Sequence, residues 1–237
     1  RVKEDVVADL PEKIEDTVMA QLTGEQRKLY LANQDRIAQQ VQHRESSEFK
    51  KDKLKVLAEL TKLRQICCDP RLHYEDYKAG SAKLDTCMEL VHGAHDGGHR
   101  ILLFSQFTGM LDIIGKRLAK EDIVFLKLTG ASSKESRAKM VAQFQAGEVP
   151  VFLISLKAGG VGLNLTAADV VIHYDPWWNV AAQDQATDRA HRIGQQHTVT
   201  VYKLIAKDTI EERIMQMQES KRDLVNSVLG GDGISSA

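Results

Sequence analysis

The sequence lacks an excess of charge of either sign. Its 237 residues contain 32 lysines and arginines against 33 aspartates and glutamates, which gives a formal net charge of -1. This excludes a protein that binds nucleic acid through a general basic field, so any such contact must be local. Hydrophobic residues make up 43% of the chain, enough to bury a full core, and we therefore expect a globular protein.

Cysteines and long apolar runs are also scarce. The three cysteines, Cys67, Cys68 and Cys87, make neither a disulfide framework nor a CxxC metal pair, which favours a reducing, intracellular environment. No apolar stretch reaches the roughly 18 residues of a membrane span, and the N-terminal sequence RVKEDVVADL has no signal-like segment. We expect neither membrane insertion nor export. Because the sequence begins without methionine, we interpret it as a fragment.

The glycine-rich segment KAGGVGLN, from Lys157 to Asn164, does not fit the familiar phosphate-binding patterns. It lacks the third glycine of a dinucleotide fingerprint, and no GK[ST] of a P-loop occurs anywhere in the chain. Gly159, Gly160 and Gly162 therefore indicate either a structural turn or a close approach of backbone to ligand. The neighbouring lysine and asparagine favour the ligand.

Three histidines and two tryptophans raise further alternatives. His92, His95 and His99 stand among glycines with no cysteine or acid at a helpful spacing, so we interpret them as a polar helix end and expect no metal site. Trp177 and Trp178 follow a predicted strand. They fit either stacking on a base or packing against the neighbouring helix, and the sequence leaves both open.

The pattern of predicted elements changes near residue 80. Before it, a strand at 14–22 leads to a helix that Thr23 caps, and a second helix at 54–68 ends at Asp69-Pro70. After it, short apolar strands alternate with amphipathic helices, which is typical of a parallel sheet covered on both faces. The sequence therefore predicts an α/β fold with a doubly wound, mostly parallel sheet. A final amphipathic helix follows, and its predicted buried stripe consists of Ile210, Ile214, Met217 and Leu224.

Polar residues follow the predicted strands at several points. The pairs Ser105-Gln106 and Thr129-Gly130, the segment from Ser155 to Asn164, and the WWN stretch each come directly after a strand. One serine or threonine after a strand is usually a helix cap, but ligands collect at the carboxyl edge of parallel sheets. We therefore expect these residues to form one polar edge.

The segment QDQATDRAHRIGQ, from Gln183 to Gln195, is rich in polar and charged residues. On one continuous helix, Gln185, Arg189 and Arg192 would lie at i, i+4 and i+7 and form a single stripe. Two guanidiniums one turn apart, with no acid between them, would repel each other unless an anion lay there. A solvated helix face is the alternative, but the spacing favours phosphate binding.

Several motifs together resemble a known family. The segments LPEKIEDTVMAQLTGEQRKLY, LRQICCDPRL, ILLFSQF, SLKAGGVGLNLTAADVVIHYD and QATDRAHRIGQ, in this order, resemble the C-terminal half of Swi/Snf-family helicase-like, DNA-translocating ATPases. The resemblance implies two RecA-like lobes, with ATP in the cleft between them and duplex DNA across both. It implies an N-terminal strand and helical protrusion at 1–80, a RecA-like second lobe at 81–206 and a C-terminal brace helix at 207–237.

The resemblance also implies residue roles. Arg192 matches the family's arginine finger and Arg189 its companion, both facing the γ-phosphate, and Gln185 would help to orient that site. The residues that would border the nucleotide are Gly160, Gly162 and Asn164. The residues that would grip DNA phosphates are Ser105, Gln106, Thr129, Gly130, Ser155 and Lys157. The P-loop lysine and the Mg-binding acids would lie on the missing first lobe, which would hold most of the ATP and Mg.

Two departures from the family pattern concern Leu156, where a threonine is common, and Val180, where a proline is common. The first puts one hydroxyl contact to DNA in doubt, and the second changes helix entry more than chemistry.

The function predicted from the sequence is the second lobe of an ATP-driven double-stranded DNA translocase or nucleoprotein remodeller, inactive without the first lobe. A self-sufficient nucleotide-binding enzyme and a catalytically silent interaction module are the rivals, and unwinding or an RNA substrate also stays open. Such a motor would work in the cytoplasm or nucleoid of a prokaryote, which Leu156 and the short protrusion favour, or in a eukaryotic nucleus.

Overall fold

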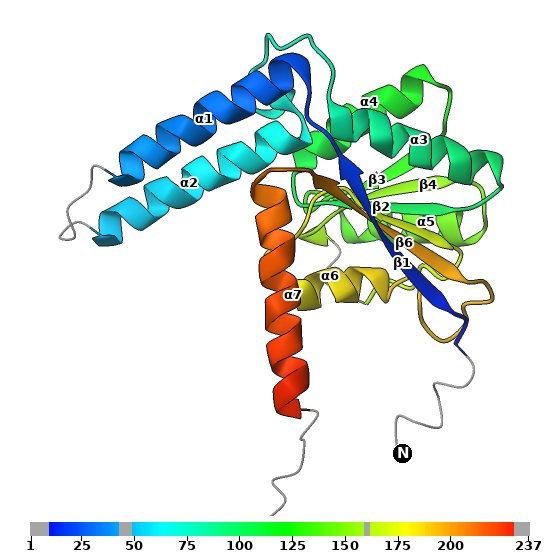
Figure 1. Ribbon diagram of the computed structural model, residues 1–237. Coiled ribbons are helices and arrows are strands. Elements are labelled where there is room, and N and C mark those ends of the chain that lie inside the picture. Colours follow the sequence, from blue (N-terminus) through cyan, green and yellow to red (C-terminus); the bar gives the residue numbers. More distant parts are fainter. Residues whose placement is uncertain (1–9, 43–48, 159–161, 230–237) are drawn as a thin grey trace, which may run out of the picture.

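The strands of the computed structural model, which describes residues 10–42, 49–158 and 162–229, form one six-stranded sheet. The order is β1-β6-β5-β2-β4-β3, and all the neighbouring pairs are parallel, as the sequence predicts (Figure 1). The strands are β1 (Lys13–Ala20), β2 (Ile101–Ser105), β3 (Phe125–Leu128), β4 (Val151–Ser155), β5 (Val170–His173) and β6 (Val199–Ala206).

Helices cover both faces of this sheet. The helices are α1 (Gly24–Gln42), α2 (Phe49–Cys68), α3 (Ala82–Asp96), α4 (Thr108–Lys120), α5 (Lys134–Gln145), α6 (Val180–Thr187) and α7 (Ile210–Leu229). All residues of β2 and β4 are buried. Successive side chains of these strands point to opposite faces of the sheet, and α3 and α4 cover one face while α5 and α6 cover the other. This burial explains why the central strands are continuous apolar runs rather than alternating patterns.

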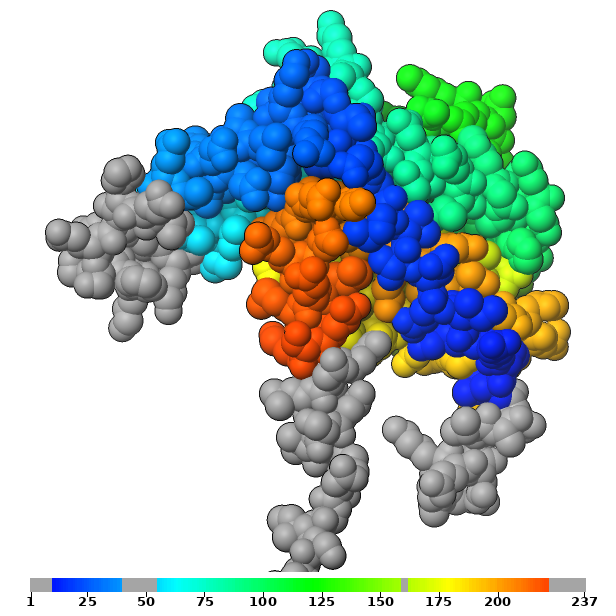
Figure 2. All heavy atoms as spheres, in the orientation of Figure 1, coloured from blue at the N-terminus to red at the C-terminus, as the bar shows by residue number. Residues whose placement is uncertain are grey.

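The helical protrusion consists of α1 and α2, which lie side by side and extend away from the sheet (Figures 1 and 2). Its base is a small hydrophobic cluster that includes Leu22, Tyr30, Ile66 and Cys67, together with Ala206 at the end of β6. β1 precedes the protrusion and pairs with β6 at the edge of the sheet, so the N-terminal segment also contributes a strand. The domain boundaries at 80 and 206 stay predictions.

The buried face of α7 differs from the predicted stripe. Ile214 is buried and Ile210 is half-buried, but Met217 is 52% exposed, so its placement in the stripe was wrong. The side chain of Leu224 lies outside the described residues. The face turned towards the sheet contains Glu211, Ile214, Met215 and Gln218 at i, i+3, i+4 and i+7. A buried glutamate, which periodicity of apolar residues cannot reveal, sets the rotation of this helix.

In the described ranges, no helix has the length and apolar character needed to cross a membrane.

Candidate functional site

The segment that carries the two arginines is a turn and not a continuous helix. α6 begins after Asn179, whose side chain accepts a hydrogen bond from the N–H of Ala181, and it ends at Thr187. The carbonyl of Arg189, which a continuing helix would offer to residue 193, instead accepts from the N–H of Leu165 at 3.0 Å. The predicted single helical stripe was therefore wrong, because α6 ends at Thr187, before either arginine, and the carbonyl of Arg189 bonds to a distant segment.

The two arginines nevertheless lie close enough to interact. Arg189 is only 6% exposed, and its Nε has no hydrogen-bond partner. Burial and the neighbouring charge of Arg192 together lower the pKa of Arg189. Arg192 is half-buried, and its Nη1 donates to the carbonyl of Leu163 at 3.4 Å. In the described part of the chain neither arginine forms an ion pair with a carboxylate. The pair can therefore accept an anion.

The end of the glycine-rich segment, residues 162–164, lies against the turn that follows α6, residues 188–195, which we call the arginine turn. The contact between Arg192 and Leu163 brings the turn next to Gly162 and Asn164, both exposed. Gly162 has φ of +54°, in the left-handed region that favours glycine. The structure thus brings together two of the three predicted nucleotide-bordering residues and both arginines. Gly160 lies outside the described residues, and Gln185 is exposed in the last turn of α6.

Gln195 holds the other end of the arginine turn, a role that sequence reasoning missed. Its side chain is 5% exposed, and its Nε2 donates to the carbonyls of Thr166, Ala168 and Ala190. Its Oε1 accepts from the backbone N–H groups of residues 196 and 197. One glutamine therefore joins the turn to the segment before β5. Its place at the end of the polar segment was visible in the sequence, but its burial was not.

The predicted DNA contacts lie in a row along the carboxyl edge of the sheet. Ser105 and Ser155 are register partners at the ends of β2 and β4, and Thr129 directly follows β3, the next strand. Gln106 and Thr129 are half-buried, whereas Gly130 and Lys157 are exposed. The two serines are buried and their hydroxyls bond within the protein. The structure brings these residues to one edge but turns only some of them outward.

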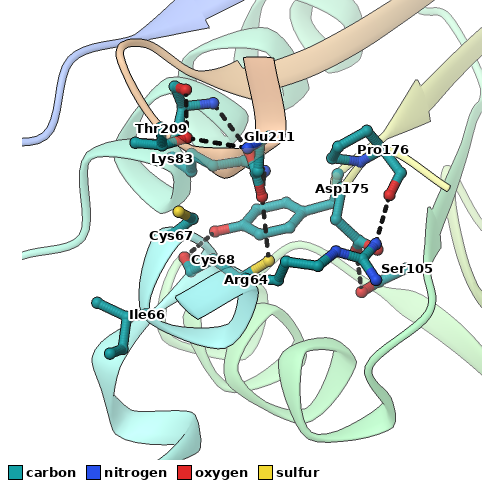
Figure 3. A network of polar contacts seen from close by, with 12 residues as sticks. Arg64, Ile66, Cys67, Cys68, Lys83, Ser105, Asp175, Pro176, Thr209 and Glu211 are labelled. Carbon is teal, nitrogen blue, oxygen red and sulfur yellow. Dashed lines mark hydrogen bonds and ion pairs between the residues drawn. The ribbon is translucent and has the colours of Figure 1, made fainter. Parts of the chain in front are cut away.

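Asp175 organises the part of this edge that surrounds β2 (Figure 3). It is 1% exposed, and its carboxylate accepts from the Ser105 hydroxyl at 2.5 Å and from Nε2 of Gln106 at 2.6 Å. The backbone N–H of Gln106 also donates to it, at 3.2 Å. This acid therefore fixes the two residues that follow β2. Asp175 could not be selected from the sequence, since an aspartate after a strand gives no local sign of its partners.

A second buried acid joins three parts of the molecule (Figure 3). Glu211 of α7 and Lys83 of α3 have completely buried side chains, and Nζ lies 2.9 and 2.8 Å from the two carboxylate oxygens. Glu211 also accepts from the N–H of Ala206 and from Sγ of Cys68, at the end of α2. The protrusion, the sheet and the C-terminal helix therefore meet at one ion pair.

The two tryptophans have different surroundings, and stacking on a base stays a prediction for Trp178. Trp177 is 2% exposed and packs edge-on against Phe104 and His173, so it belongs to the core. Trp178 is 46% exposed and lies over the guanidinium of Arg64, with its ring centroid 5.2 Å from Cζ. Arg64 comes from α2 and donates to the carbonyl of Pro176 at 2.6 Å, so the protrusion holds the loop before α6.

The histidines predicted as a polar helix end make individual contacts with acids. His92 lies 2.5 Å from Glu121, and Nδ1 of His99 lies 2.7 Å from Asp169. Nowhere in the described ranges do three or more histidine, cysteine, aspartate or glutamate side chains gather in a way that could hold a metal ion.

Two protein families match consecutive parts of the chain. Residues 82–194 match the family described as helicase conserved C-terminal domain, and residues 1–72 match the family described as SNF2-related domain. A protein of Mycoplasma pneumoniae named uncharacterized ATP-dependent helicase is 41% identical over 234 residues. These cover 98% of this chain but only 22% of that protein. The chain thus spans about a fifth of the length of such a relative.

Two solved structures are similar over most of the chain. The Sulfolobus solfataricus SWI2/SNF2 ATPase C-terminal domain is 34% identical with a TM-score of 0.76, and the match covers 95% of this chain and 91% of that one. The Sulfolobus solfataricus SWI2/SNF2 ATPase core in complex with dsDNA is 37% identical with a TM-score of 0.78. That match covers 94% of this chain and 47% of the larger core.

Proposed function

The chain belongs to the SWI2/SNF2 ATPase family, and on that premise we propose that it is the second motor lobe of an ATP-driven double-stranded DNA translocase. ATP and Mg are held mainly by a first RecA-like lobe, which supplies the P-loop and the Mg-binding acids. This lobe supplies arginines for the γ-phosphate and contacts to the DNA backbone. The lobe alone does not hydrolyse ATP. The complete motor works inside the cell, and its substrate can be a nucleoprotein, that is, DNA with bound proteins.

The arginine turn is the single observation that carries this proposal. Two guanidiniums lie close together, neither forms an ion pair with a carboxylate among the described residues, and that of Arg189 belongs to a side chain only 6% exposed. Keeping such charges together costs folding free energy, which an anion bound between them would offset. Charge that develops on a transferred phosphoryl group is such an anion, and an arginine finger accelerates hydrolysis by about 10³-fold or more.

The carboxyl edge of the sheet supplies the contacts to DNA. Thr129, Gly130 and Lys157 can meet backbone phosphates directly, because their side chains or backbones reach the surface. Ser105 and Ser155 lie directly beneath them and would reach phosphate only after a local movement. Gln106 would first have to release its hydrogen bonds to Asp175. Phosphate contacts position a protein on DNA without reading its sequence, which suits a translocase.

The proposal predicts that Arg192→Lys nearly abolishes DNA-stimulated ATP hydrolysis in the complete two-lobe protein while ATP and DNA binding stay close to normal. Lysine keeps the charge but loses the planar fork that spans two phosphoryl oxygens. If Arg192 were only a solvated surface residue, the change would alter stability by about 0.5 kcal/mol or less and leave the rate alone.

The measurement is steady-state ATP hydrolysis with saturating duplex DNA, with thermal melting as a test of folding. Arg27→Lys is the matched control, because it makes the same substitution at an exposed position of α1 and leaves the arginine turn and the carboxyl edge intact. A folded Arg192→Lys protein that hydrolyses ATP at the parent rate would show that the arginine assignment is wrong.

A further inference from the structure

His173 is a buried histidine at the end of β5 that the proposed function does not use. It is 1% exposed, stacks on Phe104 with ring centroids 5.6 Å apart, and meets Trp177 edge-on at 5.5 Å. Its Nε2 lies 2.9 Å from Oγ1 of Thr187, and its Nδ1 has no hydrogen-bond partner. The aromatic contacts fix the ring plane, so the imidazole is held rigidly towards one atom of α6.

Thr187 is the residue at which α6 ends and the arginine turn begins. Its side chain is buried, and its hydroxyl donates to the carbonyl of Gln183 at 3.3 Å. Its own carbonyl accepts from the N–H of Ala190 at 3.0 Å and from that of His191 at 3.2 Å. A shift of Thr187 would therefore move the backbone that carries Arg189 and Arg192.

The hydrogen bonds assign the proton of the imidazole. A hydroxyl donates one proton, and that of Thr187 goes to the carbonyl of Gln183, so the hydroxyl must accept from Nε2–H of His173. Nδ1 is then a buried acceptor without a hydrogen-bond partner. The other tautomer would leave a buried N–H unpaired and would lose one of the two contacts to Thr187. Burial lowers the pKa of His173 to about 3, so the neutral ring persists at physiological pH.

We propose that His173 is a positioning residue for ATP hydrolysis: its Nε2–H holds the hydroxyl of Thr187 and thereby sets the place of the arginine turn. This inference rests on the proposed function, because it assumes that Arg192 acts on the γ-phosphate. His173 touches no reacting atom. It completes a clamp whose far end is Gln195, so that the turn is held on both sides by buried hydrogen bonds.

The test compares two ways of removing this hydrogen bond in the complete two-lobe protein. His173→Phe keeps an aromatic ring against Phe104 and Trp177 but has no donor, and Thr187→Val keeps the shape of the side chain but has no hydroxyl. Each should lower kcat for DNA-stimulated ATP hydrolysis by about 10- to 100-fold, because a misplacement of about 1 Å can cost that much. The KM for ATP should change little, because binding is held mainly by the first lobe.

Three comparisons separate positioning from general stability. The double variant should be no slower than either single variant, because both remove the same bond. His173→Gln, whose amide N–H can reach towards Thr187, should recover much of the lost kcat. Tyr174→Phe removes the neighbouring buried hydrogen bond to the carbonyl of Cys68 and should lower the melting temperature without lowering kcat.

Arg192→Lys, measured in the same assay, separates the two hypotheses. If Arg192→Lys is inactive but folded Thr187→Val and His173→Phe keep the parent kcat, the positioning role is wrong and the proposed function stands. If Arg192→Lys keeps the parent rate, the proposed function is wrong and this inference falls with it. Equal losses of kcat in Tyr174→Phe and Thr187→Val at equal melting temperatures would also overturn the inference, since the effect would then be general.

Discussion

Breaking the ion pair between Lys83 and Glu211 should destabilise the chain strongly. In Glu211→Gln the ammonium of Lys83 stays buried, with both side chains 0% exposed, but it loses the carboxylate 2.8 Å away. An uncompensated buried charge of this kind costs about 3–5 kcal/mol. The free energy of unfolding of a whole domain is about 5–15 kcal/mol, so the variant would lose a large part of it.

The amide that Glu211→Gln introduces would preserve the hydrogen bond from the backbone of Ala206, so the cause of the lost stability can be identified. An amide oxygen can still accept from the N–H of Ala206, which donates to Glu211 at 2.8 Å. The loss should therefore come from the unpaired ammonium. Lys83→Met alone should be similarly harmful, because it leaves the carboxylate unpaired. The double variant has no charge at these two positions and should lose several kcal/mol less than the sum of the two single variants.

Urea denaturation of the 237-residue chain, followed by circular dichroism, measures these differences. For a chain of this size each kcal/mol shifts the melting temperature by about 2–4 °C, so Glu211→Gln should melt about 6–20 °C lower. Lys55→Met, at an exposed position of α2, is a control that should stay within about 0.5 kcal/mol of the parent. A loss below about 1 kcal/mol for Glu211→Gln, or simple additivity in the double variant, would refute the reasoning.

Three further predictions concern pH, catalysis and DNA. Burial lowers the pKa of His173 from its ordinary value of 6.5 to about 3 in the folded chain, so the unfolded state takes up the proton first and stability falls as pH drops below about 6.5. Between pH 7.5 and 5 the free energy of unfolding should fall by about 2 kcal/mol, and His173→Phe should abolish most of this fall. The charges that act on His173 are those of Lys203 and Glu15, and Glu15, with its pKa near 2, stays ionised throughout. An equally steep pH dependence in His173→Phe would contradict this. The 237-residue chain alone should hydrolyse essentially no ATP, and steady hydrolysis that survives Arg192→Lys would disprove the division of labour between lobes. Its DNA binding should be weak and indifferent to sequence, with a shallow salt dependence of about 0.9 in log K per log salt for each phosphate contact; a slope like that of a many-contact repressor would count against it.

The carboxyl edge of the sheet could be predicted from the sequence only in part. Apolar strands alternating with helices predicted the parallel sheet, and the rule that ligands collect where strands end predicted that Ser105, Ser155 and Thr129 share one edge, as the register shows. Which of them point outward could not be predicted. The hydroxyl of Ser105 turns inward because Asp175, 70 residues later, accepts a hydrogen bond from it.

The kind and order of the elements can be read from the amino-acid sequence alone, because strand and helix periodicity depends on residues that are neighbours in the chain. The tertiary structure decided where α6 ends, which face of α7 is buried and how the arginines meet. Leu165 takes the carbonyl of Arg189, and Glu211 pairs with a lysine 128 residues away. Such contacts depend on how distant segments pack, and in a buried site of low dielectric they outweigh the local preferences that the sequence pattern records.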